Sequence, residues 1–386
     1  MNFFKDFYGK EKEFFLERVC GDTSLEIAHQ PIMWRELAKH LLNIKDDIAG
    51  FMKSIKNRRI IMTGAGSSGF TARAVARFLA KRGLHCESYL TTDIVTAPSM
   101  CFPTDTPTML VSFARSGNSP ESEGAVRYAR KYIKDLCELT ITCDSESKLS
   151  KATRESDKSL VVVMPEGTND KGFAMTSSVS TMILAGFAIF SYENLANICD
   201  EILTLAKTVE ENGKTMVDIA ETCAKYNAER AWYLGSGPFN ALVEEGALKM
   251  MELTNGAVAA GFNNSPEFRH GPKTVLNNKT ITIHLISDDE YTSKYDIDLL
   301  NELIKQKDKN IIIAIADKKL NADYSVVYNT QGFNILKSVA AGLQGLVFMQ
   351  LLSMFFSLSL KITTDNPSPS GLVNRVVQGV TVYMED

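Results

Sequence analysis

The sequence has few histidines, few tryptophans, no excess of positive charge and no paired cysteines. Five histidines, two tryptophans and seven scattered cysteines occur in 386 residues. An odd number of cysteines without C-x-x-C spacing indicates neither a disulfide framework nor a zinc site. The formal net charge of −4 argues against nucleic acid as a main partner, because phosphate backbones select basic surfaces. We therefore expect a protein of the reducing cytoplasm that holds no metal.

We also expect no signal peptide, because the first stretch, "MNFFKDFYGKEKEFF", mixes charges into its apolar residues. The uncharged run Ser338–Leu360 is long enough to span a bilayer. A similar apolar run, Thr176–Phe190, stands at the equivalent place of an internal repeat. We therefore interpret both runs as buried core or dimer helices and expect no membrane partner.

The chain carries an internal duplication. Short β-branched runs alternate with helical patterns, which predicts the α/β class with parallel sheets. The turn containing Gly64 and Gly66 recurs at Gly235 and Gly237, 171 residues further on. We therefore expect tandem α/β domains. The expected boundaries are a helical segment at 1–55, domains at 56–205 and 215–365, and a tail at 366–386.

The first Gly-rich turn, "TGAGSSG", is a candidate anion site. Gly66 lets the backbone approach a ligand, and Ser67 and Ser68 stand where a helix begins, with backbone N–H groups nearby. Gly64, Gly66 and Gly69 also match the dinucleotide spacing G-x-G-x-x-G. The acidic residue that this reading needs, Asp93, arrives later than the rule expects, so NAD binding stays a minor alternative.

The second loop, "SFARSGNSPES", gathers hydroxyls around an arginine. Ser119 before Pro120 is typical of a helix start, so part of the loop has a purely structural reading. Arg115 and Ser116 beside Gly117 suit a phosphate at a helix N-terminus. In open α/β sheets such loops meet beyond the carboxyl ends of the strands, where ligands bind. A third loop, "GFAMTSS", has the same composition.

Two residues of the second half are candidates for chemistry. His270 lies in the loop "SPEFRHGPK", between an arginine and Gly-Pro, rather than on an apolar face. Glu252 stands near the end of the helical stretch "EEGALKMMELT", close to one stripe with Glu245 and Lys249. That stripe is either a solvated face with an ion pair, or it brings Glu252 to a ligand as a general base.

These motifs together resemble the SIS (sugar isomerase) domain family. The resemblance runs over nearly the whole chain and is carried by "TGAGSS", "VSFARSGNSPES", "FAMTSS", "YLGSGP", "FRHGPK" and "NPSPSGLVNRVVQGV". The motifs look most like the galactosamine-6-phosphate deaminase branch, also called tagatose-6-phosphate ketose/aldose isomerase. They are more distantly similar to the isomerase half of glucosamine-6-phosphate synthase. The resemblance implies two tandem SIS domains, each a mainly parallel five-stranded sheet flanked by helices, behind an N-terminal helical segment.

The resemblance also assigns roles to single residues. It implies a sugar-phosphate site at the first-domain loops and the tail, formed by Gly66, Ser67, Ser68, Arg115, Ser116, Ser119, Thr176, Ser177 and Arg375. It makes Glu252 the proton-transferring base and His270 the ring-opening residue, which a second subunit of a homodimer supplies. Arg115 replaces a glutamine of the synthase, so binding of the sugar phosphate should depend more on this arginine than it does in the synthase. Gln378 stands where the synthase has its Schiff-base lysine, so imine catalysis through that lysine is not implied.

The implied reaction is a deaminating aldose–ketose isomerisation of a hexosamine 6-phosphate, without cofactor or metal. Simple isomerisation of a non-amino sugar phosphate uses the same residues and stays open. A glucosamine-6-phosphate deaminase stays open too, because the configuration at C4 cannot be inferred from these motifs. A catalytically silent sugar-phosphate sensor is disfavoured, because both Glu252 and His270 are present.

Overall fold

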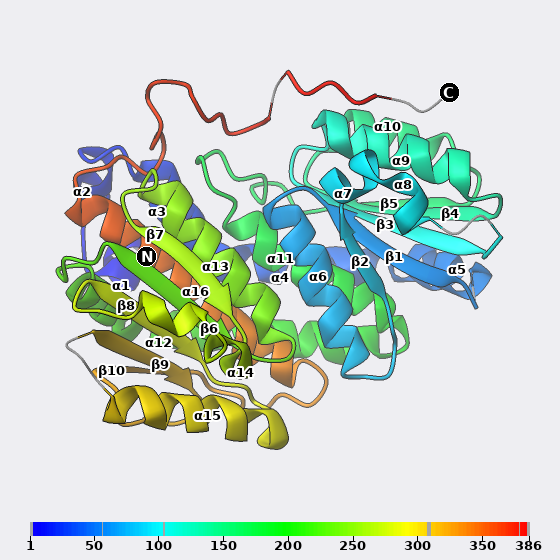
Figure 1. The fold of residues 1–386 in the computed structure, drawn as a ribbon. Coiled ribbons are helices and arrows are strands. Elements are labelled where there is room, and N and C mark those ends of the chain that lie inside the picture. Colours follow the sequence, from blue (N-terminus) through cyan, green and yellow to red (C-terminus); the bar gives the residue numbers. More distant parts are fainter. Residues whose placement is uncertain (1–2, 56, 103–104, 307–309, 378, 384–386) are drawn as a thin grey trace. The chain divides into compact units, whose positions relative to one another are not determined.

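The computed structural model describes residues 3–55, 57–102, 105–306, 310–377 and 379–383, and the chain folds into two compact units. The first-sheet unit consists of Ile32–Asp170, Ser177–Leu203 and Ser370–Asp386. The second-sheet unit consists of Met1–Pro31, Lys171–Thr176 and Thr204–Pro369. Each unit contains one five-stranded sheet (Figure 1).

The first sheet is parallel throughout, with strand order β2-β1-β3-β4-β5. Its central strand β3 is buried at every position, as expected for a parallel strand covered on both faces. Helices α6 and α11 pack together on one face, and α7 to α10 cover the other (Figure 1). The elements are β1 (Arg59–Gly64), α6 (Ser67–Ala80), β2 (Glu87–Leu90), α7 (Thr91–Thr96), α8 (Pro98–Cys101), β3 (Thr108–Ala114), α9 (Pro120–Tyr132), β4 (Leu136–Thr142), α10 (Lys148–Arg154), β5 (Ser159–Val163) and α11 (Ser177–Phe190).

The second sheet repeats this plan, with strand order β10-β9-β8-β6-β7. Matched strand by strand along the chain, both sheets have the order 2-1-3-4-5, so the predicted duplication and the α/β class are confirmed. Helices α13 and α16 lie on one face, and α14, η2 and α15 on the other (Figure 1). The elements are β6 (Arg230–Gly235), α13 (Phe239–Leu253), β7 (Ala259–Asn263), α14 (Ser265–Phe268), η2 (Pro272–Val275), β8 (Thr280–Leu285), α15 (Glu290–Lys305), β9 (Ile311–Ala316), β10 (Tyr324–Val327) and α16 (Lys337–Ser359).

The long apolar run near the end of the chain forms α16. By length and composition this helix could cross a membrane, but it is buried inside the protein from Val339 to Ser357. It packs against α13 and against α3 (Gly21–Ala28) in the same unit. The other apolar run forms α11, which is buried from Ser177 to Ile189. Both runs are therefore core helices, as predicted.

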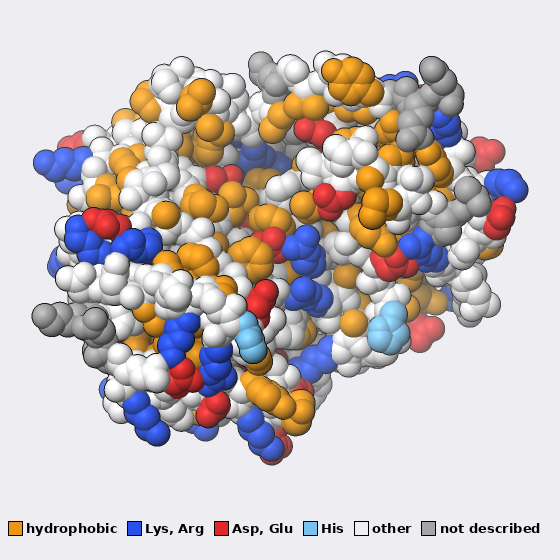
Figure 2. Space-filling view, in the orientation of Figure 1, with side chains coloured by type: hydrophobic (Ala, Val, Ile, Leu, Met, Phe, Trp, Pro, Cys, Tyr) orange, Lys and Arg blue, Asp and Glu red, His pale blue; other side chains and the backbone are white. Residues whose placement is uncertain are grey.

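The N-terminal helices are shared between the units. Helices α1 (Phe3–Tyr8), α2 (Lys12–Leu16) and α3 belong to the second-sheet unit, and α5 (Lys45–Ser54) belongs to the first. Helices α4 (Gln30–Asn43) and α12 (Leu195–Cys223) each begin in one unit and end in the other, and the short η1 (Tyr192–Asn194) precedes α12. On the face drawn in Figure 2, basic and acidic side chains of the described residues are interspersed.

Candidate functional site

The turn after β1 has the geometry that its glycines predict. Gly66 has a φ of +53° and is the N-cap of α6. A Cβ on Gly64 would lie 2.5 Å from the backbone carbon of Ser68, so only glycine fits that close approach. Ser67 and Ser68 are the first two residues of α6, and both are buried. The expected helix start is therefore confirmed.

The loop after β3 is also built as predicted. Ser119 is the N-cap of α9 in an extended conformation, with Pro120 at the first position, and its hydroxyl lies 2.7 Å from that of Ser122. Gly117 has a φ of +61° and faces Ser147 so closely that a Cβ would collide with the hydroxyl. Arg115 is 7% exposed and Ser116 is partly buried. The loop therefore turns tightly and brings a buried guanidinium to the carboxyl end of β3.

The third loop contains an internal anion that the motifs did not reveal. The backbone amides of Ser177 and Ser178 each donate to the Asp170 carboxylate at 3.0 Å, and Asp170 is fully buried. The N-terminus of α11 is thus already neutralised. The Ser177 hydroxyl is buried with no hydrogen-bond partner among the described residues. Thr176, also fully buried, is counted with the second-sheet unit, so the unit boundary falls between these two predicted ligands.

The C-terminal tail lies against these loops, within the first-sheet unit. Arg115 Nη2 donates to the Arg375 carbonyl at 2.8 Å. The Arg375 guanidinium in turn donates to the side chain of Asn169 at 3.3 Å and to the Asp170 carbonyl. Further along, the Tyr128 hydroxyl donates to the Tyr383 carbonyl. The main chain of Arg375 therefore lies beside Arg115, its predicted role toward a substrate stays a prediction, and Gln378 lies outside the described residues.

In the second-sheet unit, Glu252 stands in the last turn of α13 beside a buried lysine. Lys249 is inaccessible to solvent, and its Nζ contacts the carboxylates of Glu245, at 3.2 Å, and of Glu252. Burial opposes the charge on Lys249, but the two carboxylates outweigh it and raise its pKa. The solvated-face reading of this stripe is wrong at Glu245 and Lys249. Glu252 keeps 27% of its side chain exposed, so it can reach a ligand.

His270 follows α14 in an exposed loop. Asn264 caps α14 by accepting from the Glu267 amide at 3.0 Å, and the His270 amide donates to the Glu267 carbonyl at 2.8 Å. Gly271, with a φ of +121°, turns the chain directly after the histidine. Among the described residues, the structure records no hydrogen bond or ion pair of the imidazole, and none between His270 and Glu252. The imidazole is thus open to a substrate or to another chain.

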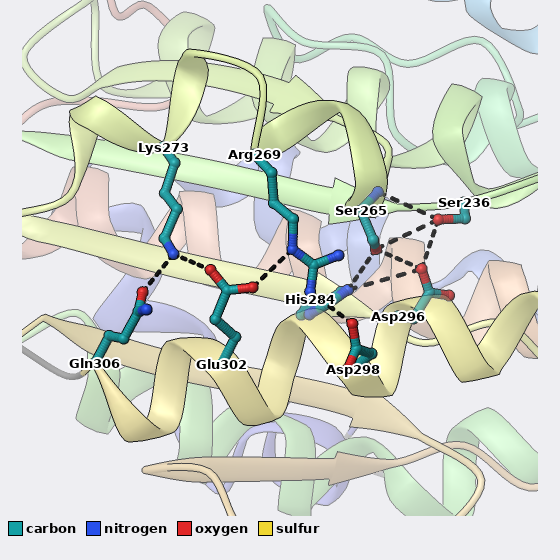
Figure 3. A network of polar contacts seen from close by, with 9 residues as sticks. All are labelled: Ser236, Ser265, Arg269, Lys273, His284, Asp296, Asp298, Glu302 and Gln306. Atoms are coloured by element: carbon teal, nitrogen blue, oxygen red, sulfur yellow. Dashed lines mark hydrogen bonds and ion pairs between the residues drawn. The ribbon is translucent and has the colours of Figure 1, made fainter.

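A buried network lies at the carboxyl edge of the second sheet (Figure 3). The Asp296 carboxylate accepts from the hydroxyls of Ser236 and Ser265 and from the Ser287 amide, and His284 Nε2 lies 2.9 Å from the Ser265 hydroxyl. Burial raises the pKa of Asp296, but the imidazole and the serines outweigh it and lower the pKa. The sequence reading missed this network, whose one local signal is a histidine inside an apolar strand.

The predicted residues thus divide between the units. The first-sheet unit contains Gly66, Ser67, Ser68, Arg115, Ser116, Ser119, Ser177 and Arg375. The second-sheet unit contains Thr176, Glu252 and His270. The dinucleotide alternative loses support, because Asp93 lies in the first turn of α7, where its carboxylate accepts from the Leu90 amide. Among the described residues, no three His, Cys, Asp or Glu side chains form a cluster suited to a metal ion.

Comparison with known proteins identifies the family. The SIS domain model matches residues 54–192. The D-galactosamine-6-phosphate deaminase AgaS of Escherichia coli O157:H7 is 36% identical over 380 residues, covering 94% of this chain and 95% of AgaS. A solved structure from Clostridium novyi NT, provisionally named a tagatose-6-phosphate ketose/aldose isomerase, has a TM-score of 0.93 at 36% identity, covering 98% of this chain and 99% of its own.

A second solved structure, the tagatose-6-phosphate ketose/aldose isomerase of Escherichia coli, has a TM-score of 0.85 at 30% identity and covers 94% of this chain and 96% of its own. These similarities extend through both sheets, although the domain model itself matches in the first. The chain therefore belongs to the SIS-domain family, in the group that includes the AgaS deaminases.

Proposed function

We propose that this protein converts galactosamine 6-phosphate and water into tagatose 6-phosphate and ammonia, in amino-sugar catabolism. The observation that carries the proposal is the full-length similarity to proteins named D-galactosamine-6-phosphate deaminase, at 36% identity over 94% of the chain. Both residues that the chemistry requires, Glu252 and His270, are present. The same similarity favours a soluble enzyme of the cytoplasm.

The first-sheet unit binds the substrate in this proposal. The phosphate lies against Arg115 and the hydroxyl-bearing loops after β1 and β3, with Ser177 and Arg375 at its border. Support comes from the buried guanidinium at the end of β3 and from the Ser177 hydroxyl, which lacks a partner among the described residues. A guanidinium and hydroxyls at helix N-termini are the donors that phosphate prefers.

The second-sheet unit carries out the chemistry. His270 assists opening of the pyranose ring by moving the C1 hydroxyl proton to the ring oxygen. Glu252 then takes the proton from C2, which gives an enolamine, and returns a proton to C1. The resulting imine at C2 is hydrolysed by water, so one ammonia leaves for each ketose formed. Lys249 supports the assignment, because its ammonium contacts Glu252 and holds that carboxylate in one position.

The proposal includes a homodimer. The family resemblance supplies His270 from a second copy of the chain, and an exposed imidazole without a recorded partner among the described residues suits that role. None of these steps requires a cofactor or a metal, because the C1 aldehyde of the opened sugar accepts the electron pair from C2, and the amine nitrogen returns it when C1 is protonated.

The test is a product assay on a panel of galactosamine 6-phosphate, glucosamine 6-phosphate and tagatose 6-phosphate. We expect ammonia and a ketose 6-phosphate in equal amounts from galactosamine 6-phosphate. Interconversion of tagatose 6-phosphate with an aldose, without ammonia release from either amino sugar, would establish the second candidate, a simple isomerase. That candidate is kept because solved relatives are named ketose/aldose isomerases. Binding without turnover would instead indicate a sensor.

A further inference from the structure

The loop that carries His270 is attached to helix α15 by the two basic residues on either side of the histidine. Arg269 donates to the Glu302 carboxylate at 2.7 Å and to the Asp298 carboxylate at 2.8 Å. Lys273 donates to the other oxygen of Glu302 and to the side chain of Gln306. One carboxylate, Glu302, therefore binds both ends of the short segment that contains His270 (Figure 3).

The residues on α15 form a regular stripe. Asp298, Glu302 and Gln306 follow one another at intervals of four, so they lie along one side of the helix. In Figure 3 all three side chains point toward Arg269 and Lys273. Arg269 thus contacts Asp298 and Glu302, one turn apart on the helix, and Lys273 contacts Glu302 and Gln306, the next turn along.

Helix α15 is itself firmly packed, which makes it a rigid support. Leu299, Leu300 and Leu303 are at most 2% exposed and pack with Phe268 and the second sheet in one apolar cluster. Just before Asp298, Asp296 binds Ser265, the first residue of α14. The loop is therefore fixed to the same helix before His270, beside it and after it.

We propose that Glu302 is a positioning residue for the reaction: by binding Arg269 and Lys273 together it holds the His270 loop in the conformation that ring opening requires. The inference rests on the proposed function, in which His270 opens the sugar ring. Glu302 contacts neither the imidazole nor the phosphate loops in any recorded bond among the described residues, so it acts through the loop alone. The partly buried pairs, with side chains 24–28% exposed, are sheltered from full solvent screening.

The experiment compares Glu302→Gln and Glu302→Ala with Glu290→Gln, a change of an exposed carboxylate in the first turn of the same helix. Hydrogen exchange of the segment 265–276 reports the anchoring directly, without substrate. We expect at least about tenfold faster exchange there in both Glu302 variants, and wild-type exchange in Glu290→Gln. Unchanged exchange in Glu302→Ala would overturn the proposal.

Turnover of galactosamine 6-phosphate separates positioning from general damage. We expect kcat of Glu302→Ala to fall about tenfold with KM within about twofold, because a misplaced catalytic group lowers the rate of the chemical step. Combined with His270→Ala, measured at high enzyme concentration, Glu302→Ala should lower the residual rate by less than about twofold. An equal tenfold loss in both backgrounds would mean a merely structural role.

These results also distinguish the inference from the proposed function. If His270→Ala alone keeps the wild-type rate, the role of the histidine in ring opening is wrong, and the positioning role of Glu302 falls with it. The exchange data would then still establish or refute the anchoring of the loop. If His270→Ala is severely impaired while Glu302→Ala exchanges and reacts like wild type, the proposed function stands and the positioning role fails.

Discussion

The two sheets have the same strand order but use the polar groups at their carboxyl edges differently. In the second sheet, serines that follow β6, β7 and β8 all bond to one buried carboxylate, Asp296. In the first sheet, the corresponding loops carry Arg115 and the hydroxyls of the candidate phosphate site. The internal carboxylate there, Asp170, caps α11. The second edge is thus filled by Asp296, whereas the loops of the first edge contain the arginine and the hydroxyls that we propose as phosphate ligands.

This contrast indicates that both copies of the duplicated α/β fold keep polar donors at the carboxyl edge of the sheet. Converging strand ends provide donors: at the second edge two hydroxyls and one amide bond to the Asp296 carboxylate, and His284 together with the two serines lowers its pKa despite its burial. In the proposed mechanism the second half supplies Glu252 and His270 for the chemistry, and the first half supplies the phosphate ligands. Four variants test this division between the two edges.

The largest effect on activity is expected at Glu252, the proposed general base. Glu252→Gln keeps the shape of the side chain but cannot accept the C2 proton, so kcat with galactosamine 6-phosphate should fall about 10³-fold. KM should change little, because the proposed phosphate ligands lie in the other unit. Ammonia release measured against substrate concentration gives both values. A wild-type rate, with Glu244→Gln as the matched control on α13, would remove Glu252 from the chemistry.

The next largest effect tests the filled edge. Asp296→Ala leaves two serine hydroxyls and the Ser287 amide without their acceptor, which should lower the free energy of unfolding by about 3 kcal/mol. Thermal unfolding should shift down by about 4–7 °C. Asp298→Ala, an exposed carboxylate two residues on, should shift it little. Equal shifts in the two variants would contradict the view that the carboxylate fills the edge.

The stabilising contribution of Asp296 depends on pH and is lost at low pH. The pKa of Asp296 is lower in the folded chain than in the unfolded one, so its ionised form is the stabilising one. Its contribution is present in full above the unfolded pKa of about 3.9 and is lost as the pH falls through the lower folded value. The difference in unfolding temperature between wild type and Asp296→Ala should therefore be constant from pH 7 to 5 and shrink below about pH 4.

A smaller effect is expected at the ligand edge. Arg115→Ala removes a charged donor from the proposed phosphate site and should raise KM for galactosamine 6-phosphate about tenfold or more, with a lesser change in kcat. Arg127→Ala, an exposed arginine on α9, is the matched control. An unchanged KM in Arg115→Ala would place the phosphate elsewhere.

The smallest effect is expected at Ser177. Its buried hydroxyl has no partner among the described residues, so Ser177→Ala should leave thermal unfolding unchanged in the absence of ligand. KM should rise about fivefold, the value of one neutral hydrogen bond to the substrate. A loss of stability without a change in KM would mean that the hydroxyl serves the fold.

Local features of the chain were predictable from the sequence, and distant contacts were not. The Gly64 and Gly66 turn, the start of α9 at Ser119 and the apolar strand β3 depend on neighbouring residues, so the sequence pattern reveals them. The network at Asp296 joins residues up to sixty positions apart, and no spacing rule connects them. The position of Asp170 against α11 depends on the path of a loop, which composition does not fix.

The candidate site shows the same limit. Motif similarity located Arg115, Glu252 and His270, because each stands in a short recognisable stretch. The burial of Lys249 was missed, since a lysine and a glutamate at helical spacing are more often solvent-exposed. The support of His270 by Glu302 was missed as well, because it joins a loop to a helix thirty-odd residues away. Motif similarity thus proposed Glu252 and His270 as the reacting groups, but it did not show the contacts that Lys249 and Glu302 make.

Helix α16 has a consequence for the order in which the protein folds. It packs against α3 near the beginning of the chain, so the second-sheet unit needs residues from both ends before it can close. The first sheet and its helices occupy one largely continuous stretch and can assemble while synthesis continues. Until it packs against α13 and α3, α16 exposes a mainly apolar surface to water. The newly synthesised chain therefore passes through a partly folded intermediate with exposed apolar surface. In that intermediate, α16 is the segment to which we expect a chaperone to bind.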